Sequence, residues 1–430
     1  MKTVEGWKTT PLPLLLRLLK SGGTPDTSHS NYYGGDIPFV TIEDMTASSR
    51  HLTSTIKALT DEGLKHSNAW LVPANSILYS IYATLGLPRI NTVPVTTNQA
   101  ILALINDPNK IDRDYLYYWF EYIRASVVNF SSQTTQSNLS ATTVKTFLVD
   151  HPTDLSEQTK IAEVLSTVDR AIEQTEALIA KQQRIKTGLM QDLFTRGIDE
   201  HGNLRSEQTH NFKDSPLGRI PVGWDVKPLG TICELIKDGT HLPPARVAEG
   251  PLLLGVQNMV DGKLTKTSSD TRVPWDFYEQ MHQNWKIQTD DVFLAIVGAT
   301  IGKTCLAPSN FEPYTLQRSV ALIRGKKGIL HNRFLLQYLK SPFFQSIIHT
   351  KTNSTAQAGL YLSQIADFHF PVCPIEEQIA ISSKLEEISN LVESYQRTGG
   401  KLHSLKTALM QDLLTGKKRV MMLLNKEVIG

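Results

Sequence analysis

At 430 residues the chain is too long for one ordinary hydrophobic core, and its formal net charge of +2 does not by itself announce a nucleic-acid partner. The three cysteines are widely spaced, which excludes a disulfide framework and a zinc cluster and fits a cytoplasmic location. An apolar run at residues 11–16 is too short for a signal peptide, so we expect a buried N-terminal element there. No run is long enough to span a membrane.

Residues 1–151 form the first predicted globular domain. Its short runs of apolar, β-prone residues at 37–42 and 77–81 predict strands, and the aromatic run at 115–120 predicts an amphipathic helix. A last strand is expected near Phe147, because a proline follows soon after it. This mixture of strands and helix predicts an α+β domain.

Residues 152–197 predict one long helix. Apolar residues recur there at steps of three and four, which indicates a coiled-coil seam. A helix of about 40 residues is ~60 Å long at 1.5 Å per residue, and it needs a partner that covers the seam to be stable in water. The predicted seam residues are Leu165, Val168, Ile172, Ile179, Leu189 and Leu193.

A second domain repeats this plan. Residues 198–215 form a polar linker whose Asp, Gly and Asn residues predict a turn or hairpin. The second globular domain, residues 216–373, has the same order of elements with different loops. Its predicted elements are strands at 252–256 and 292–296, a helix at 334–339 and a last strand near Phe370.

Residues 374–415 predict a second long helix, and residues 416–430 a basic tail. Gly399 and Gly400 interrupt the seam of this helix, so we expect a break or kink there, because glycine disfavours helix interiors. The predicted seam residues are Leu385, Ile388, Val392, Leu402, Leu409 and Leu413.

The two helices are copies of each other. Residues 186–193 return as residues 406–413 with a single change, from Gly188 to Ala408. The same spacing continues backwards without a gap to Glu157-Gln158 and Glu377-Gln378. A match this close at half the chain length indicates an internal duplication.

The order of the elements predicts that the helices run antiparallel. The termini of a domain usually lie close together, so the second helix starts beside the end of the first and buries its seam by running back along it. The predicted fold is therefore α+β, with two mixed α/β domains separated by two long antiparallel coiled-coil helices in a pseudo-twofold internal repeat. We expect a rod with one domain at each end.

Catalytic motifs are missing from the sequence. Residues 298–304 look like a phosphate-binding loop, but three residues separate the glycines where the pattern needs four, and no helix signal follows. There is no Asn/Asp-Pro-Pro-aromatic loop of amino methyltransferases, no GxSxG and no HExxH. The histidines are scattered, so no metal site is predicted. We expect a non-enzyme in which this loop is a strand-to-strand turn with Lys303 facing a phosphate.

Six short motifs together point to one family. They are Ser-Gly-Gly-Thr-Pro at 21–25 with Tyr-Tyr-Gly-Gly-Asp-Ile-Pro-Phe at 32–39, Gly-Ala-Thr-Ile-Gly-Lys at 298–303, Pro-Ile-Glu-Glu-Gln at 374–378, and the helix ends at 189–195 and 409–415. In this combination the chain resembles the specificity (S) subunit of type I restriction-modification systems. The likeness covers nearly the whole chain.

The resemblance implies a non-catalytic, DNA-binding subunit. Such subunits have two target-recognition domains separated by two helical spacers, and they read a bipartite sequence in double-stranded DNA. They hold two modification subunits, which bind S-adenosylmethionine and methylate adenine, and restriction subunits (a translocase and nuclease) then join. This chain is therefore expected to bind no cofactor itself, and its two unlike domains are expected to read unlike half-sites at a separation fixed by the helices.

Candidate DNA contacts are polar residues in loops that follow predicted strands. Asn and Gln suit adenine, and Glu or Asp can accept a hydrogen bond from cytosine. The base candidates are Thr41, Glu43 and Asp44 in the first domain and Gln257 and Asn258 in the second; the phosphate candidates are Arg89, Lys303, Arg318 and Lys351. The polar tracts 131–138 and 351–357 are also expected to face DNA.

Two other hypotheses stay open. One is a coiled-coil scaffold that binds only proteins, whose assembly should respond little to salt, whereas DNA binding weakens steeply with it. The other is a nucleotide-hydrolysing enzyme that uses the loop at 298–304. Turnover that disappears when Lys303 is replaced would support it.

Overall fold

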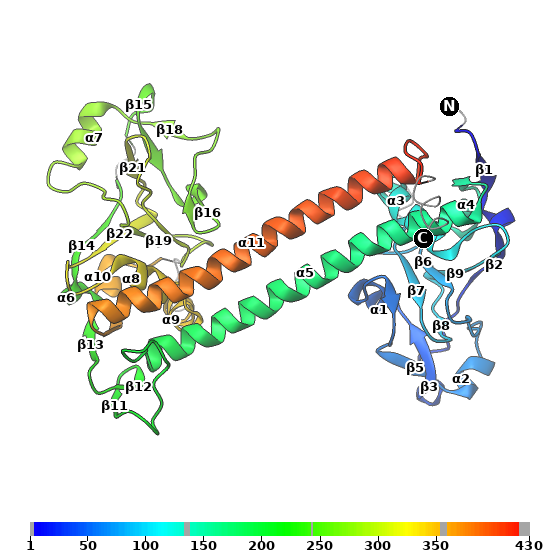
Figure 1. The fold of residues 1–430 in the computed structure, drawn as a ribbon, viewed down its shortest axis with the longest axis horizontal. Helices are drawn as coiled ribbons and strands as arrows, with labels where there is room; N and C mark the ends of the chain where they lie inside the picture. Colours follow the sequence, from blue (N-terminus) through cyan, green and yellow to red (C-terminus); the bar gives the residue numbers. More distant parts are fainter. Residues whose placement is uncertain (1–3, 133–137, 242–243, 353–358, 421–430) are drawn as a thin grey trace, which may run out of the picture. The chain divides into compact units, whose positions relative to one another are not determined.

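The computed structural model describes residues 4–132, 138–241, 244–352 and 359–420 (Figure 1). The chain forms two compact units, the first made of Met1–Glu176 with Arg397–Gly430 and the second of Ala177–Gln396. Both long helices, α5 (Leu155–Thr195) and α11 (Ile375–Leu413), contribute residues to each unit.

In the first unit, a five-stranded sheet of order β2-β9-β6-β7-β4 and a three-stranded sheet of order β5-β3-β8 carry the domain. The buried helix α3 (Arg113–Ser132) packs into the same core as the strands β6 and β9. The strands are β1 (Trp7–Pro11), β2 (Leu16–Ser21), β3 (Tyr33–Val40), β4 (His51–Leu52), β5 (Lys57–Leu59), β6 (Ile77–Ser80), β7 (Pro88–Asn91), β8 (Thr96–Thr97), β9 (Ile101–Asn106) and β10 (Leu148–Pro152). The short helices are η1 (Leu12–Leu15), η2 (Ser30–Tyr32), α1 (Ile42–Ala47), α2 (Asp61–Lys65) and α4 (Ala141–Lys145).

The second unit repeats this plan with sheets of order β14-β22-β19-β20 and β18-β15-β21. The strands are β11 (Phe212–Ser215), β12 (Gly218–Pro221), β13 (Asp225–Pro228), β14 (Cys233–Asp238), β15 (Val247–Leu254), β16 (Met259–Val260), β17 (Lys263–Leu264), β18 (Thr271–Arg272), β19 (Val292–Ala295), β20 (Thr304–Leu306), β21 (Tyr314–Leu316), β22 (Val320–Gly325) and β23 (His369–Val372). The helices are α6 (Leu229–Ile232), η3 (Val256–Asn258), α7 (Trp275–Met281), α8 (Asn332–Leu339), α9 (Pro342–Thr352) and α10 (Leu362–Ala366).

Most of the predicted elements are confirmed, with boundary shifts that have local causes. The strand expected at 37–42 ends at Val40, because Thr41 caps the helix α1 that follows. The N-terminal apolar run is buried only in part: Leu12 and Leu15 are almost fully covered, whereas Leu14 is 61% exposed. The polar linker contains a turn that is closed by a bridge between Ile198 and Leu204.

The two long helices run antiparallel within each unit. In the first unit, Leu165 near the start of α5 shares a core with Leu413 at the end of α11. In the second unit, Leu385 near the start of α11 shares a core with Leu193 near the end of α5. All twelve predicted seam side chains are buried or half-buried.

The predicted break at Gly399 and Gly400 is wrong, because α11 is one unbroken helix of 39 residues. Gly399 is buried on the seam, and a Cβ added to it would meet Thr175 Cγ2 at 3.8 Å. Two glycines cost the helix about 2 kcal/mol relative to alanine, which is less than packed seam side chains contribute. Packing against α5 therefore overrides the intrinsic preference.

Gly400→Ala should raise the free energy of unfolding by about 0.5–1 kcal/mol in urea titrations. Gly400 is exposed in the interior of α11, and a Cβ added there would meet nothing within 4 Å. Gly416→Ala is the matched control and should destabilise the chain. Its φ is +69°, and the added Cβ would lie 3.0 Å from Trp7. Equal effects of the two changes would contradict this explanation.

Each unit also contains one buried carboxylate at the start of a long helix. Glu157 of α5 accepts hydrogen bonds from Arg419 Nε at 2.5 Å and Nη2 at 2.7 Å, which raise the pKa of Arg419. Glu377 of α11 accepts from Arg205 Nη1 at 2.5 Å and Nη2 at 3.1 Å. In each case the arginine follows the C-terminal end of the other helix, so each ion pair ties the end of one helix to the start of its partner.

Candidate nucleic-acid interface

Each unit has a place where two parallel strands end side by side and polar residues follow both of them. In the first unit, β3 and β8 pair in parallel through Val40 and Thr97, and Asn98 N donates to Val40 O at 3.2 Å. In the second unit, β15 and β21 pair in parallel through Leu254 and Leu316. We call the polar residues at these two places the strand-end clusters. They comprise Thr24, Thr41, Glu43, Asn98 and Gln99 in the first unit, and Thr240, Gln257, Gln317 and Arg318 in the second.

A glycine packs the next chain segment tightly onto each cluster. A Cβ added to Gly22, just after β2, would lie 1.9 Å from Thr97 O. A Cβ added to Gly239, just after β14, would lie 2.0 Å from Leu316 O. Only glycine fits at both positions, and this brings Thr24 and Thr240 to the same edge as the strand ends.

In the second unit two amide side chains converge. The Oε1 atoms of Gln257 and Gln317 lie 2.6 Å and 2.7 Å from the point where a Cβ of Gly255 would stand. Gln257 is exposed, and Gln317 is half-buried. A pair of amides on a rigid strand end can donate and accept together, as recognition of a base edge requires.

The two clusters share a backbone plan but carry different side chains. Glu43 and Gln257 occupy the same place two residues into the turn after the first strand, and Asn98 and Gln317 begin the loop after the second strand. Gln99 in the first unit corresponds to Arg318 in the second. The two units therefore share one backbone arrangement at these places and present different polar side chains on it.

The structure gives Asp44 and Asn258 a structural role that contradicts the prediction of base contacts. Asp44 is 3% exposed; its Oδ2 accepts from Thr41 N and Oγ1, and its Oδ1 from Ile56 N at 2.8 Å. Asn258 is fully buried and bonds Gly255 N, Thr265 O and Asp270. Both sit at the third position of a capping turn, where the side chain points back at the backbone.

Arg89 is also structural, and this contradicts its prediction as a phosphate contact. Its Nε donates to Met45 O at 2.9 Å and to Ser48 O at 3.0 Å, and its Nη1 donates to Pro88 O. Burial lowers the pKa of its guanidinium. The side chain closes the end of α1.

The other candidates lie at the surface or in the strand-end clusters. Thr41 is half-buried and caps α1, while Glu43, Gln257, Lys303 and Arg318 are exposed, and their DNA contacts stay predictions. Lys303 ends the β19–β20 turn, so the loop at 298–304 is a strand-to-strand turn as expected.

Lys351 lies 5.1 Å above the ring of Phe368. Most of the tracts 131–138 and 351–357 falls outside the described residues.

Asp44→Ala should destabilise the chain by about 1–3 kcal/mol in urea unfolding, because it leaves the backbone N–H of Ile56 and of Thr41 without their acceptor. The neighbouring Glu43→Ala should change stability by less than about 0.5 kcal/mol, because Glu43 is exposed. The same pair of variants separates folding from DNA recognition. A large stability loss in Glu43→Ala would contradict its assignment to the surface.

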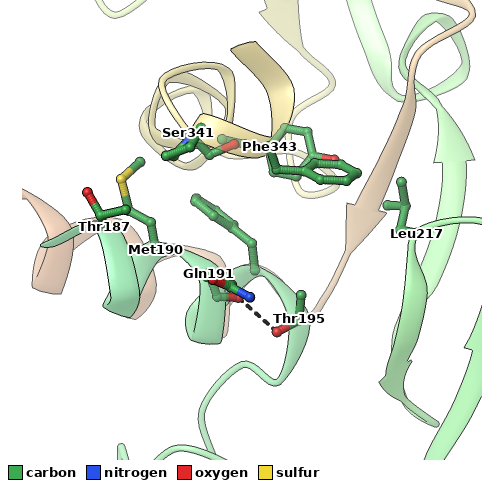
Figure 2. A pocket seen from close by; sticks show the side chains of 10 residues that line it. Thr187, Met190, Gln191, Thr195, Leu217, Ser341 and Phe343 are labelled. Carbon is green, nitrogen blue, oxygen red and sulfur yellow. Dashed lines mark hydrogen bonds between the residues drawn. The ribbon is translucent and has the colours of Figure 1, made fainter. Parts of the chain in front are cut away.

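An apolar recess of about 330 Å³ lies at the end of α5 in the second unit (Figure 2). Met190 of α5 and Phe343 at the start of α9 line the recess together with Phe194, and Leu217 of the β11–β12 turn lies at one side. Phe343 is 51% exposed, so the recess opens onto the surface. Five of its ten lining residues are apolar (Met190, Phe194, Leu217, Pro342 and Phe343), and the other five carry a hydroxyl or amide group.

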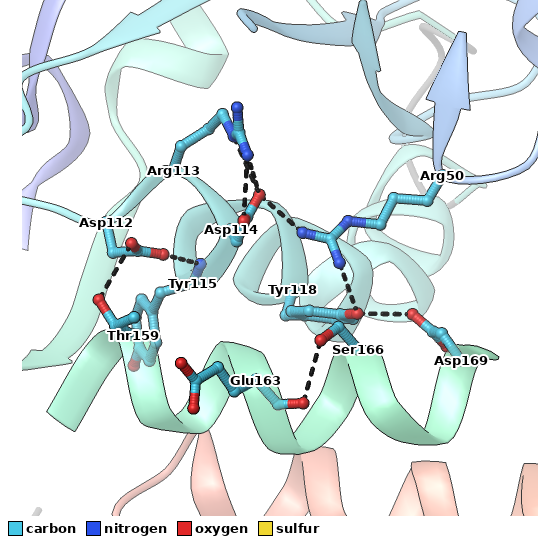
Figure 3. A network of polar contacts seen from close by, with 10 residues as sticks. All are labelled: Arg50, Asp112, Arg113, Asp114, Tyr115, Tyr118, Thr159, Glu163, Ser166 and Asp169. Atoms are coloured by element: carbon cyan, nitrogen blue, oxygen red, sulfur yellow. Dashed lines mark hydrogen bonds and ion pairs between the residues drawn. The ribbon is translucent and has the colours of Figure 1, made fainter. Parts of the chain in front are cut away.

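A polar network anchors the globular part of the first unit to α5 (Figure 3). Arg50 pairs with Asp114 at 2.6 Å and donates to Tyr118 Oη at 3.0 Å. Tyr118 Oη then donates to Asp169 Oδ2 on α5 at 2.7 Å. These contacts join the loop before β4, helix α3 and α5, so they fix the orientation of the domain on the helix.

Nothing in the described ranges assembles a metal-binding group of three or more His, Cys, Asp or Glu side chains. In the same ranges, no helix has both the length and the apolar character needed to cross a membrane.

Comparison with known proteins identifies the class. A family model described as the type I restriction modification DNA specificity domain matches residues 5–182 and again residues 221–399, once in each half. The protein is thus a DNA-specificity protein with two recognition domains. The chain belongs to the type I restriction-modification DNA specificity domain family, and its role is that of a sequence-specificity subunit.

Relatives that are specificity subunits match most of the chain. The type I restriction enzyme MjaIX specificity subunit of Methanocaldococcus jannaschii is 24% identical over 411 residues, which cover 93% of this chain and 90% of that protein. The MjaVIII specificity subunit of the same organism is 28% identical over 270 residues, 62% of this chain and 61% of that protein. The crystal structure of a type I restriction-modification S subunit from M. genitalium has the same fold, with a TM-score of 0.59, 17% identity and coverage of 95% of this chain and 96% of that one.

Five cluster residues were missed by sequence reasoning: Thr24, Asn98, Gln99, Thr240 and Gln317. Asn98, Gln99 and Gln317 follow β8 and β21, which are two and three residues long and give no strand signal of their own. The available signal was the repeated spacing from these residues to the strongly apolar strands β9 and β22.

Proposed function

We propose that each recognition domain reads one half of an asymmetric, split DNA target, that the helices α5 and α11 set the gap between the halves, and that the chain has no catalysis of its own. The observation that carries this proposal is the pair of strand-end clusters, where one backbone plan presents Glu43, Asn98 and Gln99 in the first unit and Gln257, Gln317 and Arg318 in the second. Polar side chains on rigid strand ends provide base readout, while exposed Lys303 and Arg318 provide phosphate contacts.

We further propose that the helix pair holds two modification subunits, which carry S-adenosylmethionine and methylate adenine, and that restriction subunits join this complex. Exposed side chains repeat between the helix ends: Thr187 and Gln191 return as Thr407 and Gln411. Exposed residues have no packing reason to be identical in two copies, so a partner that binds twice accounts for them. The recess beside Met190 gives this partner an apolar contact in the second unit.

Lengthening both helices by one heptad should widen the gap of the target by up to about three base pairs and leave both half-sites unchanged. Seven residues add ~10.5 Å at 1.5 Å per residue, and a whole heptad keeps the seam in register. The insertions would follow Glu176 in α5 and Gln396 in α11, and the methylated sequences would be mapped in the assembled complex.

A matched insertion of seven Gly and Ser residues at His201, in the exposed turn of the linker, is the control and should leave the gap unchanged. An unaltered gap in the helix variant would remove the helices from their measuring role. Assembly without any methylated DNA motif would favour the alternative, a scaffold that binds only proteins.

A further inference from the structure

One position beside the helix pair carries opposite charge in the two units: it is Glu121 of α3 in the first unit and Lys340, at the end of α8, in the second. In the first unit, Lys406 of α11 lies between two carboxylates, 2.7 Å from Asp169 Oδ1 and 3.1 Å from Glu121 Oε2. Burial lowers the pKa of this ammonium, but the two carboxylates more than offset it, so the pKa of Lys406 is raised. In the first unit the charge of Lys406 is therefore neutralised by carboxylates of the chain itself.

The second unit lacks both acids at the equivalent position. The two units align through Gln158, which accepts from Asp112 N, and Gln378, which accepts from His331 N. With this alignment Lys186 replaces Lys406, whereas Lys340 replaces Glu121 and Ser389 replaces Asp169. A second ammonium therefore stands where the first unit has a carboxylate.

The surrounding contacts do not neutralise this pair of lysines. Lys340 Nζ lies 3.1 Å from the point where a Cβ of Gly262 would stand, so the β16–β17 turn covers it. Lys263 of the same hairpin reaches across to Glu393 Oε2 of α11 at 3.0 Å. In the described parts of the chain neither Lys186 nor Lys340 has an ion-pair partner, and Glu393 is the acid whose charge acts on both.

The titration of these groups agrees with the geometry. Burial lowers the pKa of Lys186, and burial together with the neighbouring Lys186 lowers the pKa of Lys340. Glu386 also acts on Lys340, but it pairs with Arg333 at 3.2 Å. An arriving carboxylate would therefore gain charge-assisted hydrogen bonds from ammonium groups that are only partly hydrated.

We propose that Lys186 and Lys340 form an acceptor site for a carboxylate side chain of the modification subunit that docks on the second unit. The proposal rests on the function proposed above and adds that the two docking positions are chemically different. The first unit supplies the precedent, because carboxylates fill the same place there at 2.7 Å and 3.1 Å. A flexible acidic side chain can enter a half-buried position under a hairpin, whereas the backbone of a DNA duplex cannot bend into it.

The test is the variant Lys340→Glu of the full chain, titrated with the modification subunit by calorimetry and native mass spectrometry. This change rebuilds the internal pair of the first unit, so the variant should melt at or above the wild-type temperature. Of the two binding events of the wild type, one should weaken at least tenfold and the other should stay unchanged. Lys340→Gln should weaken the same event by a smaller factor, and the control Lys327→Glu, in an exposed turn, should change neither.

The other outcomes are distinct. Two unchanged binding events in Lys340→Glu overturn the proposal, as does a lower melting temperature, which contradicts the rebuilt pair. Normal assembly with weaker DNA binding, and a log–log salt slope smaller by about 0.9, assigns the site to a DNA phosphate and also overturns it. A wild-type chain that binds no modification subunit contradicts the proposed function itself.

Discussion

Glu377→Ala should destabilise the second unit by about 3–5 kcal/mol, because it leaves the half-buried guanidinium of Arg205 without its counter-charge and buried donors without their acceptor. The carboxylate accepts from Arg205, from Trp224 Nε1 at 3.1 Å and from the backbone N–H of Ile198 at 2.9 Å. All these donors lose their acceptor at once. Urea unfolding followed by tryptophan fluorescence measures the effect directly, because Trp224 is buried beside the carboxylate.

Two further variants identify the cause. Glu376→Ala removes an exposed carboxylate from the same turn of α11 and should change stability by less than about 0.5 kcal/mol. Arg205→Ala should cost less than Glu377→Ala, because Glu377 keeps the donors of Trp224 and Ile198. Equal losses in Glu376→Ala and Glu377→Ala would show that the ion pair is not what holds the linker against α11.

Gln257→Ala should relax one position of the second half-site and leave the first half-site unchanged. A bidentate amide contact to a base discriminates by about 1–3 kcal/mol, which corresponds to a roughly 5- to 150-fold preference. The convergence of Gln257 and Gln317 over Gly255 is the reason for placing the contact there. Methylation by the assembled complex would be measured on a library with both half-sites randomised.

Two control variants are available, one in the other strand-end cluster and one elsewhere on β15. Glu43→Ala should relax the first half-site only, because Glu43 holds the same place in the other cluster. Glu249→Ala removes an exposed charge far from the ending of β15 and should leave both half-sites intact. Relaxation of the first half-site by Gln257→Ala would contradict the assignment of one half-site to each domain.

The two long helices and their antiparallel pairing could be predicted because their signal is periodic and occurs twice. Each apolar seam residue indicates the same buried face of the helix. The residue 220 positions later gives the same indication for the second helix, as Leu193 and Leu413 show. The break predicted at Gly399 failed because propensity is local, whereas the seam is held by α5 through contacts such as Thr175.

The base-contact candidates could be predicted only in part. Burial decides which of two adjacent polar residues is exposed, and the sequence does not show it. Glu43 and Asp44 are adjacent acids after the same strand, yet one is exposed and the other is 3% exposed. The third position of a capping turn faces the backbone, and the second faces outward. Asn258 and Gln257 repeat this difference in the second unit.

The central claim is that one chain specifies two different half-sites at a fixed separation. The measurement that tests it most directly is a map of methylated adenine in the DNA of a host that carries the modification subunits, with and without this chain. The account predicts one additional motif that depends on the chain, with two unlike halves and a gap of constant length. A contiguous motif, two identical halves, or no additional motif would contradict it.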